Sequence, residues 1–202
     1  MAAETHWHKR WQDENTPWNL ERPHPLIEEL WDKAQLWLEL SAAGSAWVPG
    51  CGHGYDADWW QQKGFAVTAT DLVPEAITAA KKTHPQSAVN WQVDDALSTK
   101  LAPASFDLIY DRAMMLALPL ELRRQFLATA NQLLRPGGVF LSLAFTKVAM
   151  TDQEGPPFAM AAPALVALMP EGWNFVFGEE RDDGAVGGAI EREMLGIWQK
   201  EP

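Results

Sequence analysis

The stretch WVPGCGHGYD, residues 47–56, places three glycines within five positions directly after a short apolar run. A glycine-rich turn between a strand and a helix permits positive φ angles, and it lets a ligand approach the main chain because no Cβ intervenes. The spacing Gly50-x-Gly52-x-Gly54 departs from the dinucleotide fingerprint G-x-G-x-x-G, and no Gly-Lys-Ser/Thr sequence follows it as in a P-loop. The turn predicts a ligand site, and the elements around it decide which ligand it takes.

Strand patterns and helix patterns alternate on both sides of this turn. Apolar residues three and four positions apart predict helices, whereas alternating or continuous apolar runs predict strands. Strands that alternate with helices form a parallel sheet, and two final strands with a short connection predict an antiparallel hairpin at one edge. We expect helices at 25–40, 55–63, 73–83 and 118–134 with a short one after Pro157, and strands at 45–49, 65–71, 88–95, 105–111, 139–145, 173–180 and 189–200.

The predicted fold class is therefore α/β: a doubly wound, mostly parallel, seven-stranded Rossmann-like sheet with an antiparallel edge hairpin. A chain of 202 residues is long enough to bury one sizeable core, so we expect residues 25–202 to form one domain. Residues 1–24 carry aromatics, prolines and charges without a clean period. We expect this segment to be an irregular or partly helical arm that serves as an aromatic lid.

Composition argues against several classes of partner. The net charge of −11 disfavours nucleic acid and anionic membrane surfaces, because both bind to a basic face. No stretch approaches the roughly 18 consecutive apolar residues of a membrane span, and the polar N-terminus lacks the apolar core of a signal peptide. We therefore expect a cytoplasmic protein. The single cysteine, Cys51, excludes an internal disulfide and is expected to be a small buried residue of the turn.

In a doubly wound sheet the ligand lies outside the carboxyl ends of the strands. Asp71 ends the second predicted strand, 19 residues after Gly52, where a carboxylate can accept both hydroxyls of a ribose. After the third strand, Asp94 or Asp95 could accept an adenine amine, and Ala96 could offer a backbone N–H. Asp94 is the weaker candidate because adjacent strand residues point in opposite directions. The alternative for each acid is that it caps a helix or faces water.

Two acids at the start of the predicted helix 55–63 bear on the identity of the ligand. Asp56 and Asp58 follow the glycines, and acids at this position are unfavourable to a pyrophosphate but acceptable to a cation. S-adenosylmethionine carries a sulfonium and an ammonium, together with a carboxylate that backbone N–H groups can meet. The electrostatics favour this methyl donor. The alternative that stays open is an NAD-binding Rossmann protein, either an oxidoreductase or a non-catalytic nucleotide-binding protein.

The sequence also resembles a known family. HWHKRWQDENTPWNLERPHPLI (6–27) together with EGPPF (154–158) is similar to the thiopurine S-methyltransferase family, including its plant thiol and halide methyltransferase branch. Within the first segment, TPWNLERPHPLI (16–27) is close to the plant-branch pattern, whereas YDRA (110–113) is closer to the thiopurine branch, since the plant enzymes carry a tyrosine in place of Arg112. More broadly, four further segments resemble the class I S-adenosylmethionine-dependent methyltransferases. These segments are VPGCGHGYD (48–56), TATD (68–71), FDLIYDRA (106–113) and LLRPGGVFLSLAF (133–145).

The resemblance implies specific roles. Three tryptophans that keep the family's spacing of four and then seven residues would cover the cofactor, although the residues alone indicate core packing for them. Arg112 would be the catalytic residue, where cofactor and acceptor meet, and the EGPPF bend would border the acceptor pocket. The expected acceptor set is Trp18, Arg112, Pro156 and Phe158. The expected cofactor set is Trp7, Trp11, Trp18, Gly50, Gly52, Asp71, Leu72, Asp95, Ala96, Asp111 and Arg112.

The expected reaction is transfer of a methyl group from S-adenosylmethionine to a small soft nucleophile, with S-adenosylhomocysteine as product. The acceptor would be a thiol, an aromatic thiol such as a thiopurine, or a chalcogen or halide anion. A thiol ionises near pH 8.5, so no strong general base is required. No metal is expected, because His6 and His8 form an H-x-H pair with no third ligand nearby. The partner would be a small molecule and the protein a monomer.

Overall fold

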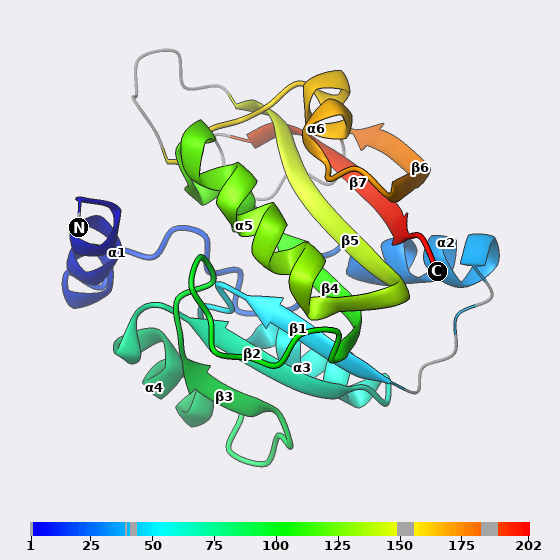
Figure 1. The fold of residues 1–202 in the computed structure, drawn as a ribbon. Helices are drawn as coiled ribbons and strands as arrows, with labels where there is room; N and C mark the ends of the chain where they lie inside the picture. The colour runs from blue at the N-terminus through cyan, green and yellow to red at the C-terminus, as the bar shows by residue number, and fades with distance from the viewer. Residues whose placement is uncertain (1, 39, 41–43, 149–155, 183–189) are drawn as a thin grey trace.

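The computed structural model describes residues 2–38, 40, 44–148, 156–182 and 190–202. A seven-stranded sheet forms its centre, with helices on both faces (Figure 1). The helices are α1 (Ala2–Gln12), α2 (Ile27–Leu38), α3 (Tyr55–Gln62), α4 (Pro74–Thr83), the 3₁₀ turn η1 (Met115–Ala117), α5 (Leu120–Leu133) and α6 (Ala162–Leu168). The strands are β1 (Ser45–Pro49), β2 (Ala66–Asp71), β3 (Asn90–Val93), β4 (Phe106–Arg112), β5 (Leu134–Val148), β6 (Trp173–Arg181) and β7 (Ile190–Lys200).

The strands lie in the order β3-β2-β1-β4-β5-β7-β6. β1 pairs in parallel with both β2 and β4, and β7 runs antiparallel to both of its neighbours, β5 and β6. The strand order reverses between β1 and β4, so the switch point, where such sheets bind ligands, lies at the carboxyl ends of these two strands. The glycine turn follows β1 and Arg112 ends β4, which places both at this point.

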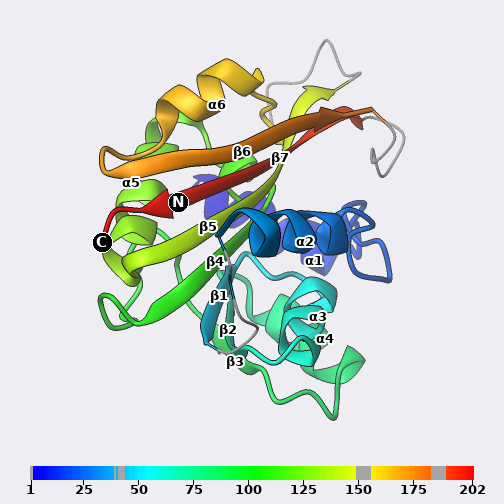
Figure 2. The same ribbon diagram turned by 90° about the vertical axis from the view of Figure 1, so that its right-hand side faces the viewer.

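Each face of the sheet is covered by helices (Figure 2). On one face, α2 and α3 bury Leu30, Trp31 and Trp60 against the strands, and α4 lies beside α3. On the other face, α5 and α6 pack over a second cluster that includes Trp47 and Phe126. Burying a side chain of this size contributes roughly 1.5–3 kcal/mol, so the two apolar layers hold the helices to the sheet. Among the described helices, none is long and apolar enough to cross a membrane.

The predicted fold class is confirmed, and two details differ. The N-terminal arm contains the helix α1, as expected for a partly helical segment. β5 begins at Leu134 rather than at residue 139, because Leu134 already pairs with Phe106 of β4 before the register shifts. The final hairpin is antiparallel as expected, but its second strand, β7, lies inside the sheet and its first strand, β6, forms the edge.

Asp111 of β4 is fully buried on the α5 face of the sheet. Its Oδ1 accepts the N–H of Met115 at 3.0 Å, and its Oδ2 accepts the hydroxyl of Ser142 at 3.2 Å. Burial raises the pKa of this carboxyl to about 6, against the opposing effect of these hydrogen bonds and of the charge on Arg123. Ionised Asp111 therefore lowers the stability of the fold at neutral pH.

We expect Asp111→Asn to raise the free energy of unfolding at pH 7.5 by up to about 3 kcal/mol, the equivalent of the pKa shift. The amide keeps an acceptor for the N–H of Met115, its NH2 group would donate to the Ser142 hydroxyl that donates to the carboxylate in the parent, and it cannot ionise. The folded parent binds the proton more tightly than the unfolded chain, so its stability falls as the pH rises from about 4 through 6. The advantage of the variant should shrink as the pH falls through this window. Urea unfolding of both proteins at pH 4.5, 6 and 7.5 measures the difference between their free energies of unfolding. A difference that does not change with pH would contradict the prediction.

Candidate active site

Two glycines of the turn between β1 and α3 are required by the packing of the protein itself. Gly50 and Gly54 have φ angles of 59° and 84°, which side chains other than glycine rarely adopt. A Cβ on Gly50 would lie 2.6 Å from Cγ of Met114, and a Cβ on Gly54 would lie 2.5 Å from the ring of Trp91. These two positions explain the bare backbone without any ligand.

Gly52 faces a more open space. Its φ is 54°, and the nearest atom to a Cβ built there would be Nε1 of Trp18, at 3.8 Å. The N–H of Gly52 donates to Oδ2 of Asp71 at 3.0 Å, and the N–H of Val73 donates to Oδ1 at 3.0 Å. Burial raises the pKa of the Asp71 carboxyl, while these hydrogen bonds oppose that shift. Asp71 thus fixes the turn, and each of its oxygens keeps a further lone pair for a ligand.

The turn after β3 lies beside Asp71, because the N–H of Asp94 donates to the carbonyl of Asp71 at 3.0 Å. The carboxylates of Asp94 and Asp95 both accept hydrogen bonds from residues of their own turn; for example, Ser98 donates to Asp95 at 2.9 Å. Ala96 is buried. The predicted adenine-binding residues therefore lie at the expected edge of the sheet, where their carboxylates also brace the turn. Leu72 is half-buried between Asp71 and Val73.

The three tryptophans of the N-terminal arm gather over the glycine turn. The Trp18 ring meets those of Trp7 and Trp11 edge-on, with centroids 5.3 and 6.4 Å apart. The Trp11 ring lies 4.6 Å from the ring of His53 in the turn. Figure 1 shows α1 beyond the end of the sheet where β1 and β4 terminate. Nδ1 of His53 is shielded from solvent, and no group in the described part of the chain forms a hydrogen bond with it.

Arg112 joins this cluster from the end of β4. Its Nη2 donates to the carbonyl of Trp18 at 3.2 Å. Its Nε lies 3.9 Å from Oδ2 of Asp56, beyond hydrogen-bonding distance, and has no hydrogen-bond partner among the residues that the structure describes. Because the Trp18 indole borders Gly52, the structure brings the turn, the arm and Arg112 together around one space.

The two acids at the start of α3, which the sequence analysis used only as evidence against a pyrophosphate, are bound by groups of the protein. Asp56 is buried; its Oδ1 accepts the N–H of His24 at 2.8 Å and its Oδ2 accepts the hydroxyl of Tyr110 at 3.1 Å. Burial, together with the charge of Asp56, raises the pKa of Tyr110 well above its ordinary value. Asp58 accepts the side-chain amide of Gln62 at 2.7 Å. Both acids contribute a negative field rather than a contact.

His24 and Glu193 were not singled out by the sequence analysis. Both are buried, and Nε2 of His24 lies 3.2 Å from Oε1 of Glu193. Nδ1 of His24 accepts the N–H of Leu26 at 3.2 Å, so Nε2 carries the proton and donates to the carboxylate. In the sequence, His24 lies between two prolines in the RPHP segment. Prolines stiffen the chain, and this was the available sign that the arm is anchored at this point.

Two other parts of the predicted site lie apart from the turn. Asp111 is adjacent to Arg112 in β4, so the two side chains point to opposite faces of the sheet. Both Asp111 oxygens bind groups on the α5 face, and the structure does not bring this carboxylate to the cofactor side. Of the EGPPF bend, residues 154 and 155 lie outside the described residues. The N–H of Phe158 donates to the carbonyl of Leu116 at 2.8 Å, which places the bend beside η1.

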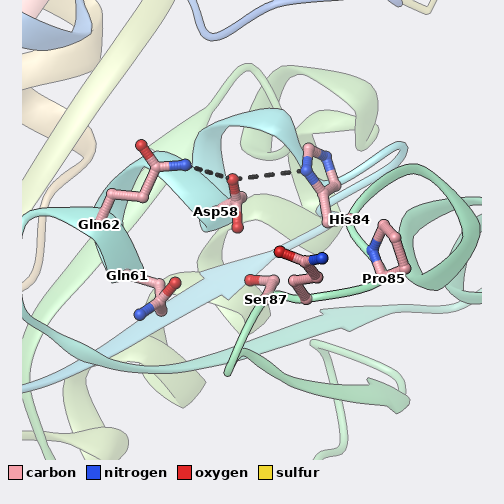
Figure 3. Close-up of a pocket in the computed structure, with 7 residues that line it drawn as sticks. Asp58, Gln61, Gln62, His84, Pro85 and Ser87 are labelled. Atoms are coloured by element: carbon pink, nitrogen blue, oxygen red, sulfur yellow. Dashed lines mark hydrogen bonds and ion pairs between the residues drawn. The ribbon is translucent and has the colours of Figure 1, made fainter.

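A hollow of about 360 Å³ lies between the end of α3 and the segment that follows α4. Asp58, in the first turn of α3, also lines the hollow, and Gln62 and His84 both contact it (Figure 3). The ring of His84 lies 5.0 Å from the ring of Tyr55, the first residue of α3. None of the residues predicted for the site lines this hollow. Its lining residues are Asp58, Gln61, Gln62, His84, Pro85, Gln86 and Ser87.

The chemistry of the space around Gly52 fits an adenosyl sulfonium. Three indoles offer faces that attract a cation, and Asp71 offers acceptors for ribose hydroxyls. Burial raises the pKa of the Cys51 thiol well above its ordinary value, and the charge of Asp71 acts in the same direction, so this thiol stays protonated. Within the described part of the chain, no three side chains of the His, Cys, Asp and Glu types are grouped to hold a metal ion.

Comparison with known proteins agrees with this chemistry. The family model described as thiopurine S-methyltransferase matches residues 2–187. Thiocyanate methyltransferase 1 of Brassica oleracea is 31% identical over 199 residues, covering 96% of this chain and 84% of that protein. Thiopurine S-methyltransferase of Vibrio atlanticus is 29% identical over 170 residues, covering 76% and 75%.

A solved structure matches the fold over the whole chain. The 1,6-didemethyltoxoflavin-N1-methyltransferase of Burkholderia thailandensis, with bound S-adenosylhomocysteine, has a TM-score of 0.72 at 19% identity, covering 100% of this chain and 88% of that one. The comparisons give no support to the NAD-binding alternative. Nearly equal identity to a plant and a bacterial relative agrees with the mixed motifs of the arm and of YDRA. The chain belongs to the thiopurine S-methyltransferase family and is an S-adenosylmethionine-dependent methyltransferase.

Proposed function

We propose that this methyltransferase acts on a small soft nucleophile, with the cofactor over Gly52 and the acceptor beside Arg112. The acceptor would be a thiol, an aromatic thiol such as a thiopurine, or a chalcogen or halide anion. The relatives' names include thiopurine and thiocyanate, both of which offer a sulfur nucleophile. The observation that carries the proposal is the position of Trp18. Its indole borders Gly52 and its carbonyl binds Arg112, so one residue contacts both halves of the site.

In this proposal the cofactor's ribose binds Asp71, and its adenine lies at the turn of Asp95 and Ala96 beside Leu72. Gly50 and Gly52 provide the close main-chain surface for its methionine part. Trp7 and Trp11 would cover it together with Trp18. When bound, the cofactor supplies a methyl carbon that its sulfonium has already activated.

The protein's own part in the reaction is to align the acceptor and exclude water. The guanidinium of Arg112 favours an anionic acceptor, because its Nε has no hydrogen-bond partner within the described residues and its charge lies at the end of β4. A thiolate already exists in part near neutral pH, so no side chain needs to act as a general base. Phe158 and Pro156 would form the far wall of the acceptor pocket.

The domain division of the sequence analysis is part of this proposal: residues 1–24 as a lid and residues 25–202 as the methyltransferase domain. The base of the lid is fixed, because the N–H of His24 binds Asp56 and its ring binds Glu193. Movement would therefore occur before His24, with Arg112 as the contact that holds Trp18 in the closed form.

The expected partners and compartment follow from charge and size. With a net charge of −11, the chain is a poor match for nucleic acid. We propose a monomer that acts in the cytoplasm on a small molecule.

Replacing Asp71 tests the cofactor half of the site. Asp71→Ala should weaken S-adenosylmethionine binding by about 2–3 kcal/mol, because charge-assisted hydrogen bonds to the ribose are lost. Asp71→Asn keeps an acceptor for one of the two backbone N–H groups and loses the other acceptor together with the charge, so it should weaken binding less than Asp71→Ala. Titration calorimetry measures both variants. Unchanged affinity in a folded Asp71→Ala protein would remove Asp71 from the site.

Replacing Arg112 tests the acceptor half. Arg112→Lys should lower kcat/KM for a thiol at least about tenfold, because a point charge does not replace a planar fork that also binds the Trp18 carbonyl. Initial rates at saturating cofactor measure the effect, and the thermal unfolding midpoint without cofactor serves as the control for folding. Equal turnover by variant and parent would rule out the assigned role.

The lid is tested by hydrogen exchange of residues 5–20 with and without S-adenosylhomocysteine. Protection should increase on binding, because the indoles close over the cofactor and exclude water. Deletion of residues 1–19 should leave a folded domain that binds cofactor weakly and transfers methyl poorly. Trp37→Ala is the control, since Trp37 is 57% exposed on α2 and should leave binding unchanged. Identical protection with and without S-adenosylhomocysteine would mean that the tryptophans only pack against the protein and do not form a lid.

A further inference from the structure

Arg123 occupies an unfavourable place for a charged side chain. It lies in the first turn of α5 and is only 2% exposed. Burial disfavours a charge, and a cation at a helix N-terminus opposes the helix dipole. Burial accordingly lowers the pKa of Arg123, and the charge of buried Asp111 opposes that shift. The hydrogen bonds of the guanidinium must offset this cost.

Those hydrogen bonds join two segments that are distant in the sequence. Nε of Arg123 donates to the carbonyl of Leu118 at 3.0 Å, and Nη2 donates to the carbonyl of Phe158 at 2.7 Å. Nη1 lies 3.9 Å from the sulfur of Met160. The guanidinium carbon also lies 5.9 Å from the centre of the Phe158 ring. One planar group therefore connects the segment after η1 to the segment before α6.

The main chain of the second segment is held at further points. The N–H of Phe158 donates to the carbonyl of Leu116 at 2.8 Å, and the N–H of Met160 donates to the carbonyl of Phe145 in β5 at 3.2 Å. Leu116 lies four residues after Arg112 in the chain. Segment 156–160 is thus fastened to the carboxyl-end rim of β4 and β5. The Phe158 ring is only half-buried, so packing around the ring does not fix it alone. Its position depends on the main chain, whose carbonyl Arg123 holds.

We propose that Arg123 is a positioning residue for the methyl acceptor: its guanidinium fixes segment 156–160 to residues 116–118 and so sets where the Phe158 wall stands relative to Arg112. This inference rests on the proposed function, in which Phe158 lines the acceptor pocket. A lysine cannot donate to both carbonyls in a planar fork. If the Phe158 segment is less firmly held, an aromatic acceptor is aligned less well with the cofactor. The preference of the enzyme for an aromatic acceptor over a small acceptor then falls.

The test uses the full chain with thiophenol and hydrosulfide as acceptors. Arg123→Lys should raise KM for thiophenol about tenfold, as expected from loss of a hydrogen bond to a charged group. The KM for hydrosulfide should change much less, and the Kd for S-adenosylhomocysteine should stay within about twofold of the parent value, because the cofactor half is untouched. Arg124→Lys is the matched control, since this neighbouring arginine is exposed and should change neither constant.

Phe158→Ala tests the same wall without touching Arg123 and decides the matter if Arg123→Lys does not fold. It should reproduce the rise in KM for thiophenol, because it removes the ring that Arg123 positions. An unchanged KM for thiophenol in either folded variant would overturn the proposal, as would a parallel loss of affinity for S-adenosylhomocysteine. A parent that binds S-adenosylhomocysteine but methylates neither acceptor would instead refute the proposed acceptor class.

Discussion

The buried carboxylate of Asp56 is the contact on which the site depends. It binds the main chain of His24 at the base of the arm and the hydroxyl of Tyr110 in β4, and it faces the guanidinium of Arg112. A buried charge that lost these partners would cost several kcal/mol, so the arm, α3 and β4 are held in one arrangement. The position of Trp18 follows from it, because the residues that fix both ends of its segment, Arg112 and His24, belong to the same cluster.

This cluster also changes how the electrostatics of the site work. Asp56 and Glu193 bring two carboxylates, while Arg112 brings one guanidinium and His24 is a neutral donor. The local charge is therefore negative, although both oxygens of Asp56 already accept hydrogen bonds from His24 and Tyr110. Such a field still favours a sulfonium and an ammonium over a pyrophosphate, because Coulomb interactions reach beyond direct contact in a partly buried site.

Local patterns were sufficient to predict the fold, and long-range contacts limited the prediction of the site. The β1 strand and the glycine turn could be predicted because apolar runs and positive φ are properties of neighbouring residues. The role of Asp56 could not, since its partners are 32 and 54 residues away in the chain. The face on which the Asp111 side chain lies had a usable signal: Asp111 is adjacent to Arg112 in a strand, so the two side chains point to opposite faces of the sheet. Arg123 offered none, because its partners become neighbours only in the folded chain.

The three glycines of the turn have different physical causes, and this limits what the motif alone can indicate. Gly50 and Gly54 are bare because Met114 and Trp91 occupy the space that a Cβ would need. A protein without any ligand would require them equally. Only Gly52 is free of such a neighbour, and its amide is held by the same aspartate that is placed to receive a ribose. The spacing of glycines therefore reports mainly on how β1, α3 and β3 pack. The ligand is indicated instead by Gly52 with Asp71, since a Cβ on Gly52 would only reach ordinary contact with Trp18.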